Sequence, residues 1–374
     1  MIERAFLCIS CWLLLIVFSA LPPSANAAPS VVDGRREVLQ GTHANRGFLP
    51  RSCRACHRKM NIAITGEESG CLTCHGGDDA RQAMRDAGLL KGKPKLADIE
   101  NSLQKTYNHP VLTISGVHQR REILPEDQVD VARHSECVDC HSPHLSEKER
   151  PFAGLRGKRV GNLIADIEQE YELCYLCHSD SANLPFNSTN KHSEFRIENR
   201  SYHPVEAEGR NLYVISLKDP YVEKAEKPNE VSRISCKDCH GNDDPDGAKG
   251  PHGSIYRGLL VENFQMDDAL PESEFAYALC YKCHERASIL GNESFPYHAQ
   301  HIQGNSAAGV DGTSCITCHD AHGSSNYQYL IRFNEDVVLP NADGKLAFES
   351  QGASSRTGSC LLNCHGVEHN PKSY

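Results

Sequence analysis

The sequence is poor in the side chains that usually fill a protein core. It has 4 methionines and one tryptophan, and aromatic residues make up 7% and hydrophobic residues 39% of its 374 residues. A chain of this length cannot build an ordinary hydrophobic core from so little apolar volume. Basic charge is also lacking. The formal net charge of −10 excludes the basic surface that phosphate binding needs, so we expect no nucleic-acid partner.

Long apolar runs are absent except at the start of the chain. The run from Ala5 to Leu21 is followed by Ala25-Asn26-Ala27, the small-residue pattern of a cleavage site. We therefore predict a signal peptide over residues 1–27, with an uncleaved membrane anchor as the alternative. No transmembrane span is expected in the mature chain, and the predicted location is periplasmic, outer-membrane associated or extracellular.

Cysteine and histidine are abundant, and they occur together. The pattern C-x-x-C-H, the attachment signature of c-type haem, occurs seven times. In such a site two thioethers hold the haem, and the adjacent histidine becomes the proximal iron ligand. The cysteine pairs are Cys53/Cys56, Cys71/Cys74, Cys137/Cys140, Cys174/Cys177, Cys236/Cys239, Cys280/Cys283 and Cys315/Cys318. The histidines that follow them are His57, His75, His141, His178, His240, His284 and His319.

The end of the chain contains a stretched copy of this pattern. The seven motifs use 14 of the 18 cysteines, Cys8 and Cys11 lie in the predicted signal peptide, and the two that remain are Cys360 and Cys364. These two have three residues between them and are followed by His365. We therefore predict an eighth haem site, and eight haem c groups in all. Zinc sites or disulfides would not explain why a histidine follows every second cysteine.

Each haem iron has one further axial position, and histidine is its predicted ligand. Eight irons with two histidines each need 16 of the 20 histidines, whereas Met60, Met84 and Met266 are the only methionines after residue 27. Bis-histidine ligation and low potentials are therefore expected. The candidate distal ligands are His43, His109, His144, His203, His252, His301, His322 and His369, with His118, His134, His192 and His298 as alternatives.

The motifs form paired units in a chain of little regular structure. Three units cover residues 71–144, 174–252 and 280–322, single sites flank them at 53–57 and 360–365, and the whole octahaem region is 28–374. The predicted fold class is mostly irregular coil with short α-helices and little β-structure, packed around haem. Helices are expected over 160–178, 272–284 and 78–90, and a small hairpin over 339–351.

The words "RHSECVDCHSPH", "SCITCHDAHGSS" and "CLLNCHGVEHNPKSY" resemble the multihaem c-type cytochromes of metal-reducing bacteria, which occur in the periplasm and on the outer surface. This resemblance implies electron transfer with redox partner proteins, including a porin–cytochrome conduit. We expect an electron carrier and not an enzyme. Two alternatives stay open: an octahaem oxidoreductase with one open haem acting on a small oxyanion, and a homo-oligomer or filament.

Overall fold

The computed structural model describes residues 38–57, 67–112, 118, 124, 134–147, 150, 152–160, 163–180, 182–185, 188–305, 307, 309–352 and 356–374. The predicted signal peptide lies outside these residues. Within them, no helix combines the length and the apolar character that crossing a membrane requires.

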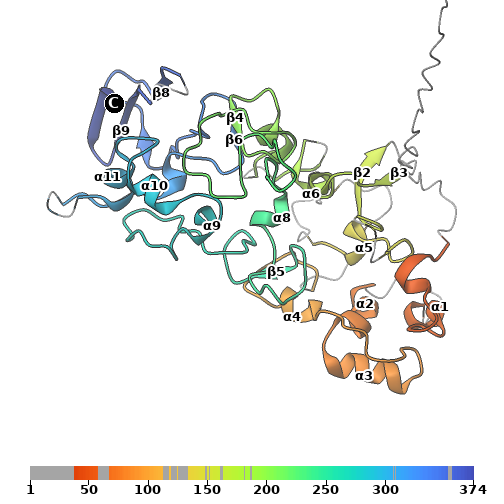
Figure 1. Cartoon of the computed structure of the whole chain (residues 1–374). Coiled ribbons are helices and arrows are strands. Elements are labelled where there is room, and N and C mark those ends of the chain that lie inside the picture. The colour runs from red at the N-terminus through yellow and green to blue at the C-terminus, as the bar shows by residue number, and fades with distance from the viewer. Residues whose placement is uncertain are drawn as a thin grey trace, which may run out of the picture.

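The chain crosses the molecule from one end to the other in sequence order (Figure 1). Helices α1, α2 and α3 lie at one end, α5, α6 and α8 follow, and strands β8 and β9 lie at the opposite end. Elements that are neighbours in sequence are thus neighbours in space, as expected for stacked repeats.

The helices are short, and several contain a C-x-x-C-H motif. Their bounds are η1 Gly41–Ala44, α1 Ser52–Cys56, α2 Glu67–His75, α3 Asp78–Asp86, α4 Ile99–Leu103, α5 Cys137–Cys140, α6 Glu170–His178, α7 Lys191–Phe195, α8 Cys236–Cys239, α9 Ala278–Tyr281, α10 Arg286–Leu290, α11 His298–Gln303 and η4 Cys315–Thr317. Capping boxes open three of the motif helices, α5, α6 and α8. A capping box satisfies backbone donors at a helix start, so these short turns do not depend on helix propensity alone.

The strands form small separate sheets. Their bounds are β1 Tyr107–Asn108, β2 Arg156–Val160, β3 Leu163–Asp166, β4 Ser201–Tyr202, β5 Gly253–Ser254, β6 Gly323–Ser324, β7 Val338–Leu339, β8 Ala347–Ser350, β9 Gly358–Cys364 and β10 Val367–Ser373. Antiparallel pairs join β1 to β5, β2 to β3 and β4 to β6. At the C-terminal end, β9 pairs with β10, β7 and β8.

The apolar side chains gather in small clusters. One joins Leu49, Ala55, Met84 and Leu90, and another joins Ala276, Tyr277, Tyr281 and Ile302. Cysteines of the motifs pack against both clusters: Cys74 against the first, and Cys280 and Cys315 against the second. The packing of the chain therefore centres on the predicted attachment sites.

Three sequence-based elements differ from the structure. The helix predicted over 160–178 is wrong in its first half, where β2 and β3 form a hairpin and only α6 is helical. Of 272–284, only α9 is assigned as helix. In the predicted 339–351 hairpin a turn forms at Gly344, but β7 and β8 both pair with β9 and not with each other. The helix predicted over 78–90 is present as α3.

Candidate haem-binding sites

Each of the seven C-x-x-C-H motifs adopts a helical turn. Two lie within α2 and α6, and in the other five the histidine N–H donates to the carbonyl of the first cysteine, with N···O distances of 2.7–3.0 Å. Residues three apart are neighbours on a helix, with Cβ atoms about 5–6 Å apart. The turn therefore brings the two sulfur atoms to one side, as attachment to one porphyrin edge requires.

A second histidine ring faces six of the motif histidines. The ring centres are 6.1–6.5 Å apart in the pairs His43–His75, His57–His144, His141–His252, His203–His284, His240–His322 and His298–His319. An iron–nitrogen bond of about 2.0 Å on each side, plus the distance from nitrogen to ring centre, predicts a separation of roughly 6 Å for two imidazoles on one metal. The spacing thus fits two axial ligands on one haem iron.

His178 belongs to the one remaining helical motif, the fourth in the chain, and His109 is the histidine that acts most strongly on its pKa. Burial is the main cause that lowers the pKa of His178 to about 4, and His109 is the next contributor. His109 shares one feature with His43 and His203: Nδ1 of each donates to the carbonyl of a residue that directly precedes another histidine.

The same backbone arrangement recurs three times and holds two histidines at once. We call it the histidine clamp. A strand-like segment carrying one histidine lies against the segment carrying another, and Nδ1 of the first histidine donates to the carbonyl of the residue before the second. The Nδ1 bonds run from His43 to Pro143, from His109 to Pro251 and from His203 to Ala321, and the second histidines are His144, His252 and His322.

The clamps also fix which ring nitrogen can bind a metal. A carbonyl oxygen can only accept, so Nδ1 of the first histidine carries the proton and Nε2 presents a lone pair. Such a bond from the non-ligating nitrogen orients a histidine ligand and raises its basicity. In the proximal set, His240 and His319 make the same kind of bond, to the carbonyls of Gly258 and Tyr329.

Two glycines allow the second-histidine segments of the second and third clamps to approach helices α4 and α7, which precede the first histidines. A Cβ at Gly253 would overlap the carbonyl oxygen of Ser102, and a Cβ at Gly323 would overlap that of Glu194. In the sequence, these glycines follow His252 and His322 directly. The sequence shows a glycine after each of these histidines, but only the structure shows that the two glycines admit a neighbouring backbone.

The clamps join different units. His141 of the first predicted unit faces His252 of the second, and His240 of the second faces His322 of the third. His284 of the third unit in turn faces His203 of the second. The first and second units therefore do not complete their own sites, because they exchange histidines with their neighbours, whereas His319 of the third unit faces His298 of the same unit.

Burial keeps these imidazoles neutral. Desolvation is the main cause that lowers the pKa of His75, His252 and His284 to about 4, and the pKa of His298 to about 3. At neutral pH the rings therefore offer a lone pair, which is the form that binds a metal.

Cysteines of successive motifs lie near one another. The thiols of Cys174 and Cys236 shift each other's pKa, and those of Cys280 and Cys315 do the same: the pKa is raised for Cys174 and Cys315 and lowered for Cys236 and Cys280. Burial chiefly raises the pKa of Cys140 to about 12, and the nearby Cys177 adds to this effect. Since the cysteines mark the porphyrin edge, this proximity shows which attachment sites are adjacent.

The eighth motif differs from the other seven. Cys360 and Cys364 lie on strand β9, and His365 lies in the turn after it with a φ of +50°. Four residues along a strand span about 13 Å, which is far longer than the separation in the helical motifs. Nε2 of His365 lies 3.7 Å from Oδ2 of Asp268. With β9 in this form, these residues do not fit the two thioether bonds of one haem, and the eighth site stays a prediction.

The remaining candidate histidines are placed as follows. The alternative His298, and not the candidate His301, faces His319. Nδ1 of His301 donates to the carbonyl of Tyr297, and Nδ1 of His369 lies 3.3 Å from that of Val367. His192 is exposed and bonded to Asp180. His118 and His134 face each other with ring centres 4.2 Å apart, too close for an iron between them.

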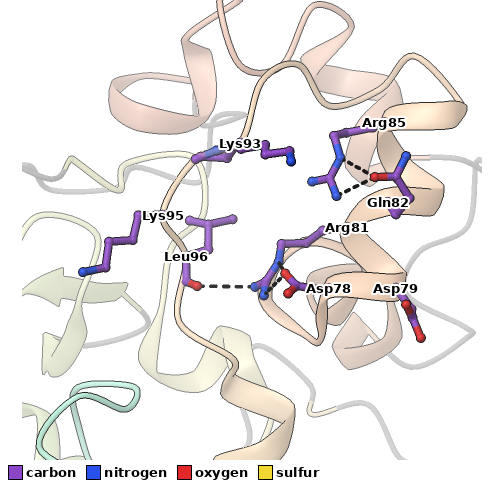
Figure 2. Close-up of a pocket in the computed structure, with 9 residues that line it drawn as sticks. Asp78, Asp79, Arg81, Gln82, Arg85, Lys93, Lys95 and Leu96 are labelled. Atoms are coloured by element: carbon purple, nitrogen blue, oxygen red, sulfur yellow. Dashed lines mark hydrogen bonds and ion pairs between the residues drawn. The ribbon is translucent and has the colours of Figure 1, made fainter.

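One cavity of about 470 Å³ has none of these histidines in its lining. Figure 2 shows it between α3 and the segment 93–96, where Arg81 bonds both Asp78 and the Leu96 carbonyl. Its lining holds no cysteine or histidine, so it offers none of the ligands that a c-type haem requires.

Comparison with known proteins adds a family match. Residues 158–330 match the family described as outer membrane cytochrome MtrC/MtrF-like, domains II/IV. The matched segment contains four of the helical motifs, those at Cys174, Cys236, Cys280 and Cys315. The chain is a multihaem cytochrome. Its cofactors are c-type haems. None of the curated proteins or solved structures compared with this cytochrome gave a significant match.

Proposed function

We propose that this cytochrome carries electrons along haems that its motifs hold covalently and ligate with two histidines each. The observation that carries the proposal is the set of six facing ring pairs at 6.1–6.5 Å, and His109 is the histidine that acts most strongly on the pKa of His178 in the remaining motif. An iron with both axial positions filled passes electrons and binds no substrate, so the protein is a carrier and not an enzyme.

The contacts between motifs support a single unbranched path in sequence order. Ala55 of the first motif and Cys74 of the second share one apolar cluster, and helix α2 packs on α5 of the third motif. Cysteines near enough to shift each other's pKa then link the third motif to the fourth, the fourth to the fifth and the sixth to the seventh. Cys239 lies near Cys283 and Cys280, which links the fifth motif to the sixth. Short separations between neighbours favour rapid transfer along this series.

The ends of the path lie at opposite ends of the molecule (Figure 1). This arrangement suits a protein that receives electrons from one partner and delivers them to another. The match to outer membrane cytochromes supports a place in extracellular electron transfer, with a porin–cytochrome conduit as the donor. The net charge of −10 favours basic partners or cationic acceptors. The expected potentials are low, because bis-histidine ligation lacks the methionine ligand that raises them.

An eighth haem at Cys360 and Cys364 belongs to the proposal as a rearranged site. Burial chiefly raises the pKa of Cys318 to about 12, and Cys360 and Cys364 contribute further. The β9–β10 hairpin therefore lies near the seventh motif, and a haem attached there would extend the path. Attachment requires the C-terminal part of β9 to change from strand to turn. The alternative function, an oxidoreductase with one open iron, would also use the site of Cys360, Cys364 and His365. Within the described residues, no second histidine ring faces His365.

The test combines intact mass with electron paramagnetic resonance of the fully oxidised holoprotein. The mass counts the attached haems, and we expect eight, all low-spin. In His322→Ala one iron should become high-spin, because the ring facing His240 is removed. The matched control His192→Ala replaces an exposed histidine and should leave the spectrum unchanged. A stoichiometric high-spin signal in the unmodified protein would favour the oxidoreductase, and an unchanged spectrum in His322→Ala would refute the proposed ligation.

A further inference from the structure

Two histidines that face no motif histidine lie together near the third motif. His118 and His134 have ring centres 4.2 Å apart, and both side chains are 7% exposed. Glu136, 3% exposed, lies beside them with its Oε1 3.8 Å from Nε2 of His134. One ligand atom from each of these three residues lies within 4.8 Å of the other two.

We propose that His118, His134 and Glu136 bind a divalent cation of the zinc class. Two imidazoles and one carboxylate are a common ligand set for Zn²⁺, with a solvent molecule in the fourth position. Ligand atoms around tetrahedral zinc are about 3.3 Å apart, since each bond is about 2.0–2.1 Å. The ligand atoms, which lie within 4.8 Å of one another, must therefore approach by up to about 1.5 Å on metal binding.

The carboxylate of Asp139 contacts the ring nitrogen of His118 that would not bind the metal. Nδ1 of His118 lies 2.9 Å from Oδ2 of Asp139, so a metal would be bound by Nε2. A carboxylate that accepts from the non-ligating nitrogen orients a histidine and increases its basicity toward the metal. Asp139 is therefore a positioning residue in this site, and it is itself fixed by accepting from the N–H of Glu136.

The position of Glu136 is fixed in the same way. Its side chain takes part in the capping box of α5 and accepts from the backbone N–H of His118 at 2.7 Å. A carboxylate has about four lone-pair positions, so these bonds leave room for a metal. The site also collects two buried carboxylates, and a divalent cation would balance their charge.

Two other roles for the histidines fit less well. Axial ligation needs ring centres near 6 Å, and the motif histidines that have a facing ring have it from other residues. A haem propionate would be repelled by Glu136 and Asp139. The bound cation would link His118 to Glu136 at the start of the third motif. It would thereby hold the His118 segment in place beside the haem of that motif.

The test uses the full-length holoprotein with Zn²⁺ alone as the probe. After removal of loosely bound metal, elemental analysis and titration should give one zinc per chain in addition to the haem iron. X-ray absorption at the zinc edge should show nitrogen and oxygen ligands and no sulfur. His118→Ala should lose this zinc, and Asp139→Asn should weaken binding by about 10–100-fold. The control His192→Ala should bind as the unmodified protein does.

Several outcomes would overturn the proposal. These are the absence of tight zinc in the unmodified protein, equal binding in His118→Ala, or sulfur ligands in the zinc spectrum. Asp139→Asn and the spectrum of the unmodified protein keep the test decisive if His118→Ala does not fold. None of these readouts depends on electron transfer, so the result is independent of the proposed function.

Discussion

Replacing Gly323 by alanine tests the histidine clamp most directly. The added Cβ would overlap the carbonyl oxygen of Glu194, and backbone atoms cannot rotate away as a side chain can. Strand β6 must move by roughly 1 Å to restore ordinary contact. Overpacking and weakened pairing with β4 together should destabilise the fold by about 2–4 kcal/mol.

The displacement should reach two irons. His322 precedes Gly323 and faces His240, while His203, which faces His284, donates to the carbonyls of both Ala321 and, through its backbone N–H, His322. Guanidinium unfolding followed by circular dichroism gives the stability. Electron paramagnetic resonance spectra recorded at denaturant concentrations below the unfolding transition should show two irons becoming high-spin together.

Gly209→Ala is the matched control. The nearest atom to its added Cβ is 4.0 Å away, on Pro204, so the change in stability should stay within about 0.5 kcal/mol. If Gly323→Ala matched this control in stability and kept every iron low-spin, the role of the clamp in holding two ligands would be wrong.

Three further predictions concern the hydrogen bonds of single side chains. In Ser254→Ala the buried Leu260 carbonyl loses its donor at 2.6 Å, and unfolding should show a loss of about 1–3 kcal/mol, whereas the exposed Ser325→Ala should show almost none. Asn190→Ala removes the cap that accepts from the Ser193 N–H, and a loss of about 1 kcal/mol is expected by the same assay, with an unchanged midpoint speaking against it. Burial acts to raise the pKa of Asp268, but hydrogen bonds from Ser314, Thr317 and Thr313 outweigh it and leave the pKa below its ordinary value. Because a lowered pKa stabilises the fold above the unfolded pKa of about 3.9, Asp268→Asn should be less stable than the unmodified protein near pH 6, and the difference should shrink as the pH falls below 4. A constant difference would contradict this sign.

The sequence located the haem chemistry but not the partners of each histidine. The spacing C-x-x-C-H is local, so the seven helical motifs could be recognised without a fold. The ring facing His141 is that of His252, which lies beyond the next two motifs, and no local spacing predicts a contact between segments so far apart. The choice of His298 over His301 also depends on how α11 is oriented toward His319.

The errors in secondary structure have identifiable causes. The apolar residues of 160–166 were interpreted with a helical period, although Gly161-Asn162 between β2 and β3 is a sequence signal for a turn. The extended form of Cys360–Cys364 comes from pairing with β7, β8 and β10, which are tertiary contacts that override local preference. The same pairing explains why 339–351 is not a hairpin.

The exchange of histidines between units has a consequence for how the protein matures. Secretion delivers the chain from its N-terminus, and on the proposed ligation the motifs at His57, His141 and His240 take their second ligand from segments that emerge later. Each newly loaded site would wait, half-ligated and reactive, until the next stretch of chain arrives. A chain ending before His322 would thus fail not only at its cut end but also at a site upstream, and shortening this cytochrome to that extent would require a new histidine to replace the lost ligand.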